Sequence, residues 1–138
     1  MIDYGNFQRA LEHLTRQNEN RHHLSAEQPD LIREAVMESV IQRFETCYDC
    51  LWKVLKRYLA EELGLPDVPN SPKPVLRLAH ESGLLPSEIG RWLLYADARV
   101  GTAHDYSGAK AAACLALTDD FVADAIALYG KLSGQPWT

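Results

Sequence analysis

The fold is decided by residues 29–64, which read PDLIREAVMESVIQRFETCYDCLWKVLKRYLAEELG. Apolar side chains recur along this stretch at helical spacing: Leu31, Ala35, Ile41, Phe44, Tyr48, Leu51, Leu55, Tyr58 and Leu63. Pro29 and Asp30 suit a helix start, Gly64 suits a helix end, and no Pro or Gly lies between them. About 34 residues in one helix would extend about 50 Å. A helix of this length in a small protein is typical of the spine of a helical bundle.

The segments on either side also favour helices. Before the spine, a helix is predicted over residues 4–19, with Phe7, Leu11 and Leu14 on its inner face at spacings of four and three. A polar loop or frayed end is expected over 18–23. After it, residues 65–74 carry four prolines and are predicted to be a connector. A short helix is then predicted over 75–82, stopped by Gly83.

Two more helices are predicted in the second half of the chain. Ser87 is expected to cap the first of them, and its inner face is expected to consist of Ile89, Leu93, Ala96 and Val100, continued by His104. The last helix is predicted over 107–132, with an inner face of Phe121, Ala125 and Leu128. No stretch alternates like a strand, so we predict an all-α, up-and-down bundle of four to five helices, forming one domain over residues 1–138.

Composition and charge narrow the class of protein. The net charge of −5 argues against broad, charge-driven binding to duplex nucleic acid, although a local cationic cleft remains compatible with it. No apolar run approaches the ~20 residues that span a bilayer, and residues 1–5 do not resemble a signal peptide. Three cysteines do not make a disulfide framework. We therefore expect a cytoplasmic protein without a membrane partner.

Arg99, His104 and Tyr106 form the strongest candidate site. An arginine grips phosphate, a histidine exchanges a proton near neutral pH, and a tyrosine hydroxyl can accept a transferred group. Positions five apart on a helix differ by about 140° around the axis and about 7.5 Å along it, so Arg99 and His104 cannot easily meet within one helix. Either the helix ends between them, which Gly101 would permit, or each meets its counterpart from a second subunit.

Other reactive residue types have ordinary structural interpretations. Cys47 and Cys50 form a single C-x-x-C without the second pair that a structural zinc site needs, so packed or half-exposed thiols are expected there and at Cys114. The adjacent His22 and His23 are expected in a polar surface loop. Two clusters of charged residues are expected to face solvent. They are the basic group Lys53, Lys56 and Arg57 and the acidic group Asp119, Asp120 and Asp124. We therefore expect no metal site and no cofactor.

The nucleotide-handling motifs are absent from the sequence. It contains no phosphate-binding glycine loop and no Asp-x-Asp pair of the kind that holds two magnesium ions in nucleotidyl transfer. The chain alone is therefore not expected to be a nucleotidyltransferase.

Two blocks of sequence resemble a known family. One runs IQRFETCY over residues 41–48 and continues to Arg57, and the other runs WLLYADAR over 92–99 into AHDY over 103–106. Both look like the nucleotidyltransferase substrate-binding proteins, a branch of the HEPN superfamily. The second block carries the arginine, four intervening residues, the histidine, one residue and the tyrosine that mark the superfamily.

The resemblance implies a helical homodimer that works with a separate minimal nucleotidyltransferase, usually encoded beside it. It further implies that the chain is either the substrate-binding subunit of that enzyme or a toxin that the enzyme silences by transferring AMP to Tyr106. An alternative that it also implies is a metal-independent ribonuclease toxin, with Arg99 and His104 as catalytic residues and RNA as substrate. A third interpretation is a non-catalytic helical interaction protein.

The sequence departs from the family pattern at one position. A polar residue commonly follows the motif arginine, whereas this chain has Val100, which cannot hydrogen-bond to a substrate. We therefore expect ribonuclease activity to be weak or absent.

Overall fold

The computed structural model describes residues 1–104 and 108–137, apart from the side chain of His104. These residues form five α-helices, and none of them is in a β-strand. The helices are α1 (Gly5–His22), α2 (Asp30–Glu61), α3 (Pro72–Glu81), α4 (Ile89–His104) and α5 (Gly108–Ser133). The predicted all-α helical bundle is confirmed.

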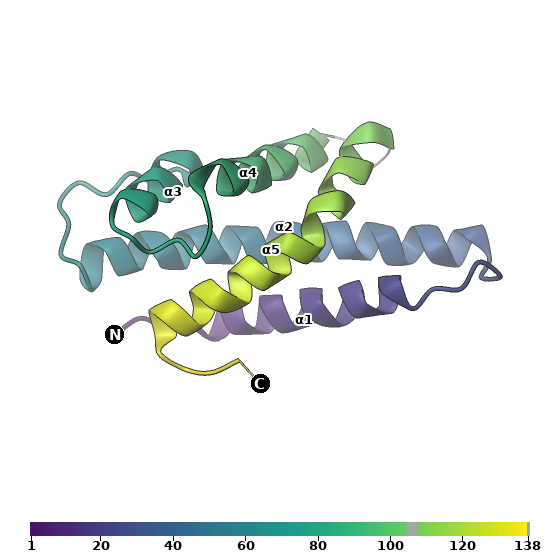
Figure 1. Cartoon of the computed structure of the whole chain (residues 1–138), viewed down its shortest axis with the longest axis horizontal. Helices are drawn as coiled ribbons and strands as arrows, with labels where there is room; N and C mark the ends of the chain where they lie inside the picture. The colour runs from purple at the N-terminus through teal and green to yellow at the C-terminus, as the bar shows by residue number, and fades with distance from the viewer. Residues whose placement is uncertain (105–107, 138) are drawn as a thin grey trace.

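Helix α2 is the spine of the bundle (Figure 1). Helix α1 runs antiparallel along one side of α2, α3 and α4 cover one half of its length, and α5 crosses the pair obliquely. The Tyr4 hydroxyl donates a hydrogen bond of 3.1 Å to the carbonyl oxygen of Leu132, which ties the start of α1 to the end of α5. The two chain ends therefore lie at the same end of the bundle.

The core lies where α1, α2 and α5 face one another. The predicted inner faces of α1 and α5 are fully buried there: Phe7, Leu11, Leu14, Phe121, Ala125 and Leu128. The phenyl rings of Phe44 and Phe121 meet edge to face, with centroids 4.8 Å apart. The helical periodicity therefore located most of the core correctly.

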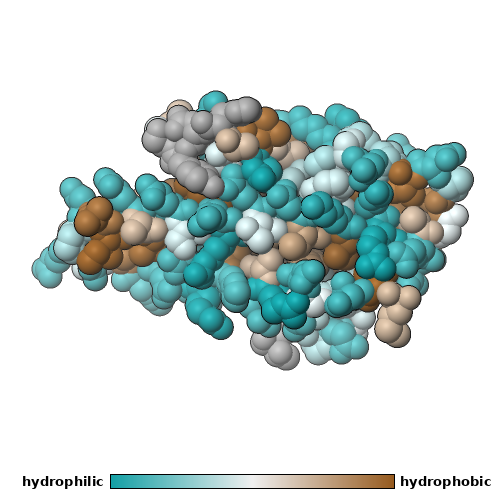
Figure 2. Space-filling model, turned by 180° about the vertical axis from the view of Figure 1, so that it is seen from behind, coloured by the Kyte–Doolittle hydropathy of each residue, from teal (hydrophilic) through white to brown (hydrophobic). Residues whose placement is uncertain are grey.

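The first turns of α2 do not belong to the core. Leu31 is 78% exposed and Ala35 is also exposed, so their predicted place on the inner face is wrong. Burial on α2 begins at Val40, because the ends of α1 and α5 leave the earlier turns uncovered. Figure 2 shows this projecting end with hydrophobic surface on it, where Leu31 and Ile32 are exposed.

Several helix boundaries differ from the predicted ones. Helix α1 continues to His22 instead of ending at residue 19, because polar side chains of its last turn bond to α5. Helix α3 starts at Pro72, inside the predicted connector, since a proline is tolerated in the first turn of a helix. Gly64 and Gly83 have positive φ values of 64° and 73° just after α2 and α3, as expected for helix-terminating glycines.

Candidate functional site

Helix α4 does not end at Gly101. It continues to His104, which rules out the alternative that the helix ends between Arg99 and His104. The buried Thr102 anchors this last turn, because its hydroxyl donates a hydrogen bond of 2.8 Å to Oε2 of Glu45 in α2. Arg99 and His104 therefore sit on one unbroken helix, about 140° apart around its axis.

The Arg99 guanidinium is held between two carboxylates of α2. Its Nη1 lies 3.0 Å from Oε2 of Glu45, while Nε and Nη2 each lie 3.2 Å from a different carboxylate oxygen of Asp49. This forked contact with Asp49 matches the planar geometry that makes arginine a good ligand for carboxylates and phosphates. The structure thus joins α4 to α2 through a group of four residues, which we call the Arg99 cluster: Glu45, Asp49, Arg99 and Thr102.

Sequence reasoning missed the carboxylate half of this cluster. Glu45 and Asp49 are four residues apart, which places them one turn apart on the same side of α2. Glu45 is only 8% exposed, and it follows directly on the buried Phe44. A carboxylate beside the apolar face of a helix was the available signal that a cation lies opposite, because buried charges are normally paired.

A pocket of about 690 Å³ lies beside the Arg99 cluster, between α2, the first turn of α3 and α4. Tyr48, Trp52 and Arg99 line it together with Val100. Val100 is 59% exposed, so its predicted place on the inner face of α4 is wrong. The buried face of α4 instead carries Trp92, Tyr95, Ala96 and Thr102.

The remaining predicted site residues lie at the edge of the described structure. His104 is the last residue of α4, and nothing is described of its side chain. Tyr106 lies outside the described residues. The structure therefore brings Arg99 together with Glu45 and Asp49, and the contacts of the other two motif residues remain predictions.

A second arginine of α4 binds carboxylates of α5. Nε of Arg91 lies 3.0 Å from Oδ2 of Asp124, and the same oxygen accepts a hydrogen bond of 2.5 Å from the Tyr95 hydroxyl. Arg91 also lies 3.4 Å from Asp120. Asp124 is buried, so the prediction that it faces solvent is wrong.

Near the start of α4, the indole of Trp92 bonds to the segment that precedes the helix. Nε1 of Trp92 donates a hydrogen bond of 2.9 Å to Oγ of Ser87. Helix α4 begins at Ile89, so Glu88 and not Ser87 directly precedes it. The Ser87 hydroxyl thus orients a core side chain, and its predicted place as the cap of this helix is not observed.

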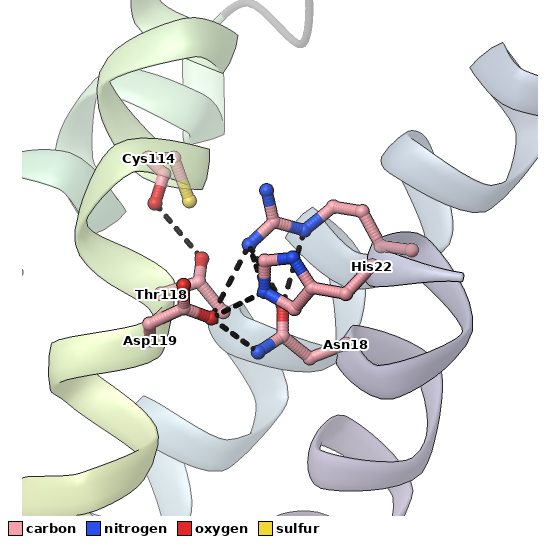
Figure 3. Close-up of polar contacts among 6 residues, drawn as sticks. Asn18, His22, Cys114, Thr118 and Asp119 are labelled. Atoms are coloured by element: carbon pink, nitrogen blue, oxygen red, sulfur yellow. Dashed lines mark hydrogen bonds and ion pairs between the residues drawn. The ribbon is translucent and has the colours of Figure 1, made fainter. Parts of the chain in front are cut away.

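The end of α1 meets α5 through a polar cluster around Asp119. Figure 3 shows Asn18 and His22 pointing toward this carboxylate, each with a nitrogen 2.7 Å from Oδ1. The hydrogen bond from His22 is the main reason that the pKa of Asp119 lies below its ordinary value. His22 is therefore the last residue of a helix, bonded to α5, and not part of a loop.

Within the described residues, no group of three or more His, Cys, Asp or Glu is arranged to hold a metal ion.

The three cysteines are packing residues that are buried to different extents. Cys47 and Cys114 are buried, and Cys50 is half-buried. Burial raises the pKa of all three thiols, and it brings that of Cys114 to about 12. Because the thiolate is the reactive and metal-binding form, the buried thiols of Cys47 and Cys114 suit neither role near neutral pH. This confirms the structural interpretation of the Cys47–Cys50 pair.

The chain matches one family of proteins along nearly its whole length. The family model described as "nucleotidyltransferase substrate binding protein like" matches residues 2–134. The chain belongs to this family.

None of the helices that the described residues form has both the length and the apolar character needed to cross a membrane.

Proteins with known names or structures are similar to this chain along most of its length. A Haemophilus influenzae protein named probable ribonuclease HepT is 32% identical over 107 residues, which are 76% of this chain and 73% of that protein. The structure of HI0074 from the same species is described as the fold of a substrate-binding domain of a nucleotidyltransferase. It matches with a TM-score of 0.84 and 27% identity, covering 95% of this chain and 99% of HI0074. A crystal structure of a Thermus thermophilus protein matches with a TM-score of 0.75 and 32% identity, covering 91% and 98% of the two chains.

Proposed function

We propose that this chain is a HEPN-type subunit that pairs with a separate minimal nucleotidyltransferase. In this pair it is either the substrate-binding subunit or the component that the enzyme silences by transferring AMP to Tyr106. Membership of the nucleotidyltransferase substrate-binding family supports the pairing, as does the description of HI0074. The sequence itself lacks the Asp-x-Asp pair needed for nucleotidyl transfer, which is consistent with that chemistry belonging to a partner.

The observation that carries the proposal is the unbroken course of α4. The backbone positions of Arg99 and His104 lie about 140° apart around one helix, which disfavours a shared site within a single copy. In a two-fold homodimer, each residue would approach its counterpart from the second copy, and one short motif would be doubled into a complete site. A particle with the mass of a single chain at micromolar concentration in light scattering would argue against this assembly.

The modification is tested by co-expression with a separate minimal nucleotidyltransferase of the kind proposed as partner. The Tyr106 phenol oxygen attacks the α-phosphorus of ATP, pyrophosphate leaves, and the phenol proton passes to a base of the partner enzyme. Intact-mass analysis is expected to show an added AMP unit that disappears in Tyr106→Phe and persists in the control Tyr58→Phe. An unmodified chain, or an adduct that survives Tyr106→Phe, would remove Tyr106 from the proposal.

A second candidate function is metal-independent RNA cleavage. It is favoured by the name of the HepT relative and by the position of Arg99 beside a pocket. In a dimer, one His104 takes the proton of the ribose 2′-hydroxyl as that oxygen attacks phosphorus. The other His104 protonates the departing 5′-oxygen, and the two copies of Arg99 stabilise the charge that develops on phosphorus.

RNA cleavage is tested with the purified chain in the presence of EDTA. Activity is expected to resist EDTA and to fall by a factor of about 100 or more in His104→Ala and in Arg99→Ala. Activity that needs metal, or that persists in His104→Ala, would contradict this site. A chain that neither cuts RNA nor accepts AMP, yet still binds its partner, would be the non-catalytic interaction protein.

A further inference from the structure

A groove between α1 and α2 lies on the side of the bundle away from α3 and α4. Figure 1 shows α1 on the opposite side of α2 from these two helices, and the described backbone of α1 packs against neither of them. A pocket of about 170 Å³ lies in the groove, lined by Ala10 and His13 of α1 and by Gln42, Arg43 and Thr46 of α2. The groove is therefore separate from the larger pocket beside the Arg99 cluster.

Neither wall of this groove carries a carboxylate. Spacings of three and four along each helix continue the lining of the small pocket into two rows. The row on α1 is Asn6, Arg9, His13, Gln17 and Asn20, and the row on α2 is Ser39, Arg43, Thr46 and Cys50. The acidic neighbours Glu12 and Glu38 are turned about 100° away from these rows. In a chain with a net charge of −5, the two rows, which we call the α1–α2 groove, combine basic and neutral polar residues alone.

The half-buried Arg43 is the centre of the groove. Its Nη1 donates a hydrogen bond of 3.0 Å to the carbonyl oxygen of His13, and no carboxylate of a described residue lies within ion-pair distance of it. A guanidinium has five N–H donors in a planar fork that fits phosphate. Arg43 is thus placed to bind an anion, unlike the arginines that pair with carboxylates: Arg21, Arg57, Arg91 and Arg99.

The size and the lining of the groove favour a chain of phosphates as the ligand. The pocket at Arg43 is smaller than the roughly 300 Å³ at which small-molecule sites begin, so it suits a phosphate group and not a whole nucleotide. A second cation, the exposed Arg9, lies one turn from His13 and bonds to the neutral amide of Asn6 at 2.7 Å. Neither row has an aromatic or large aliphatic side chain, whereas protein interfaces have an apolar core and base-stacking surfaces have aromatic rings.

We propose that the α1–α2 groove binds the sugar–phosphate backbone of single-stranded RNA. Arg43 binds one phosphate at the small pocket, Arg9 binds another farther along the strand, and the amides and hydroxyls of the two rows bond to phosphate and ribose oxygens. Contacts of this kind position a strand without reading its sequence. The inference rests on RNA cleavage, the second candidate function, and adds a contact that holds the substrate on the other side of α2 from Arg99.

The test is a binding titration of the purified full chain by fluorescence anisotropy. The probes are single-stranded oligoadenylate and oligouridylate with 2′-O-methyl riboses, which cannot be cut by attack of a 2′-hydroxyl. The variants are Arg43→Gln and Arg9→Gln. The matched control is Arg77→Gln, which removes the same charge from an exposed position on α3. Circular dichroism checks that every variant is folded.

Both groove variants are expected to weaken binding of the two oligonucleotides to the same extent. Arg43→Gln should weaken it about tenfold at low salt, and the exposed Arg9→Gln about threefold. Each variant should also reduce the slope of log affinity against log salt by about 0.7, the value for one phosphate contact with a single strand. The control should bind like the unmodified chain. Because Arg9 is exposed, its variant keeps the test decisive even where Arg43→Gln does not fold.

Three results would overturn the proposal. The first is that neither oligonucleotide binds at low salt, and the second is that Arg77→Gln weakens binding as much as the groove variants do. The third is that polyglutamate of equal length displaces the oligonucleotide as well as unlabelled RNA does, since the groove would then take an acidic protein segment.

Cleavage of unmodified RNA is measured separately from binding. A chain that binds the methylated oligonucleotides through Arg43 and Arg9 without cutting RNA would retain the groove and lose the ribonuclease function. A chain that cuts RNA through His104, with binding unaffected by the groove variants, would retain the ribonuclease function and lose the groove.

Discussion

Helix α4 carries two arginines, Arg91 and Arg99, which bind carboxylates on two different helices. Arg91 pairs with Asp124 of α5, and the neighbouring Tyr95 hydroxyl bonds to the same carboxylate. Arg99 pairs with two carboxylates of α2, but the neighbouring Tyr48 lines a pocket and its hydroxyl takes no part. Similar residue types thus make two different structures. Both clusters join α4 to another helix. The Arg91 cluster includes a hydrogen-bonded tyrosine hydroxyl, whereas the Arg99 cluster leaves the Tyr48 hydroxyl without a described partner and borders a pocket.

The largest effect on stability is expected at the Arg91 end of α4. Asp124→Ala removes the acceptor of the buried Tyr95 hydroxyl and should lower the free energy of unfolding by about 2 kcal/mol. The matched control is Asp120→Ala, because that carboxylate is 61% exposed and should cost less than about 0.5 kcal/mol. Urea unfolding measures both. Equal losses in the two variants would show that burial does not set the strength of this cluster.

A smaller loss of stability is expected at the Arg99 end. Glu45→Gln keeps an oxygen acceptor for Thr102 but removes one negative charge from Arg99, and it should cost about 1 kcal/mol in urea unfolding. A loss as large as that of Asp124→Ala would contradict the ranking of the two ends of α4.

A third carboxylate cluster sharpens the comparison because it is mostly exposed. The pKa of Asp119 is lowered in the folded chain, so its ionised form adds stability that is present above pH ~4 and is lost as the pH falls through the lowered value. With 59% of the side chain exposed, Asp119→Asn should cost no more than about 1 kcal/mol at pH 7. The gap between the two proteins in thermal unfolding should narrow as the pH falls below about 4. A gap that widens in acid would contradict the sign.

The smallest effect is expected at Gly101, between Arg99 and Thr102. This glycine lies inside α4, and the nearest atoms to a β-carbon there would belong to the Lys110 side chain, at an ordinary contact distance of 3.8 Å. Gly101→Ala should therefore raise the free energy of unfolding, by about 0.5 kcal/mol or less so near the end of the helix. A loss of stability would mean that the unbroken course of α4 through this position is wrong.

The sequence predicted the helices well, but it did not predict which face of α4 is buried. Phe7, Phe44 and Phe121 were placed correctly, because one apolar face dominates each of their helices. Helix α4 has two competing apolar faces, and spacing alone favoured the one containing Val100. The structure buries the other face, since its aromatic rings reach the core and its arginines reach carboxylates of α2 and α5.

The candidate site was predicted only in part for a related reason. The motif arginine was identified from the family pattern, but Glu45 and Asp49 lie about fifty residues earlier in the chain and become its neighbours only through packing. The same is true of the pocket, which needs three helices to form. Uncovered turns, as at Leu31, depend on where neighbouring helices stop, which the periodicity of one helix does not encode.

Because two thiols are buried, the rate at which they are alkylated measures how often the helical bundle opens. Cys47 lies in α2 and Cys114 in α5, both without exposed surface, so an alkylating reagent reaches them only when the contact between these helices is broken. Cys50, one turn from Cys47 and half-buried, supplies an internal reference within the same helix. The ratio of labelling at the buried and half-buried positions would follow how often the bundle opens while a ligand or a partner is added.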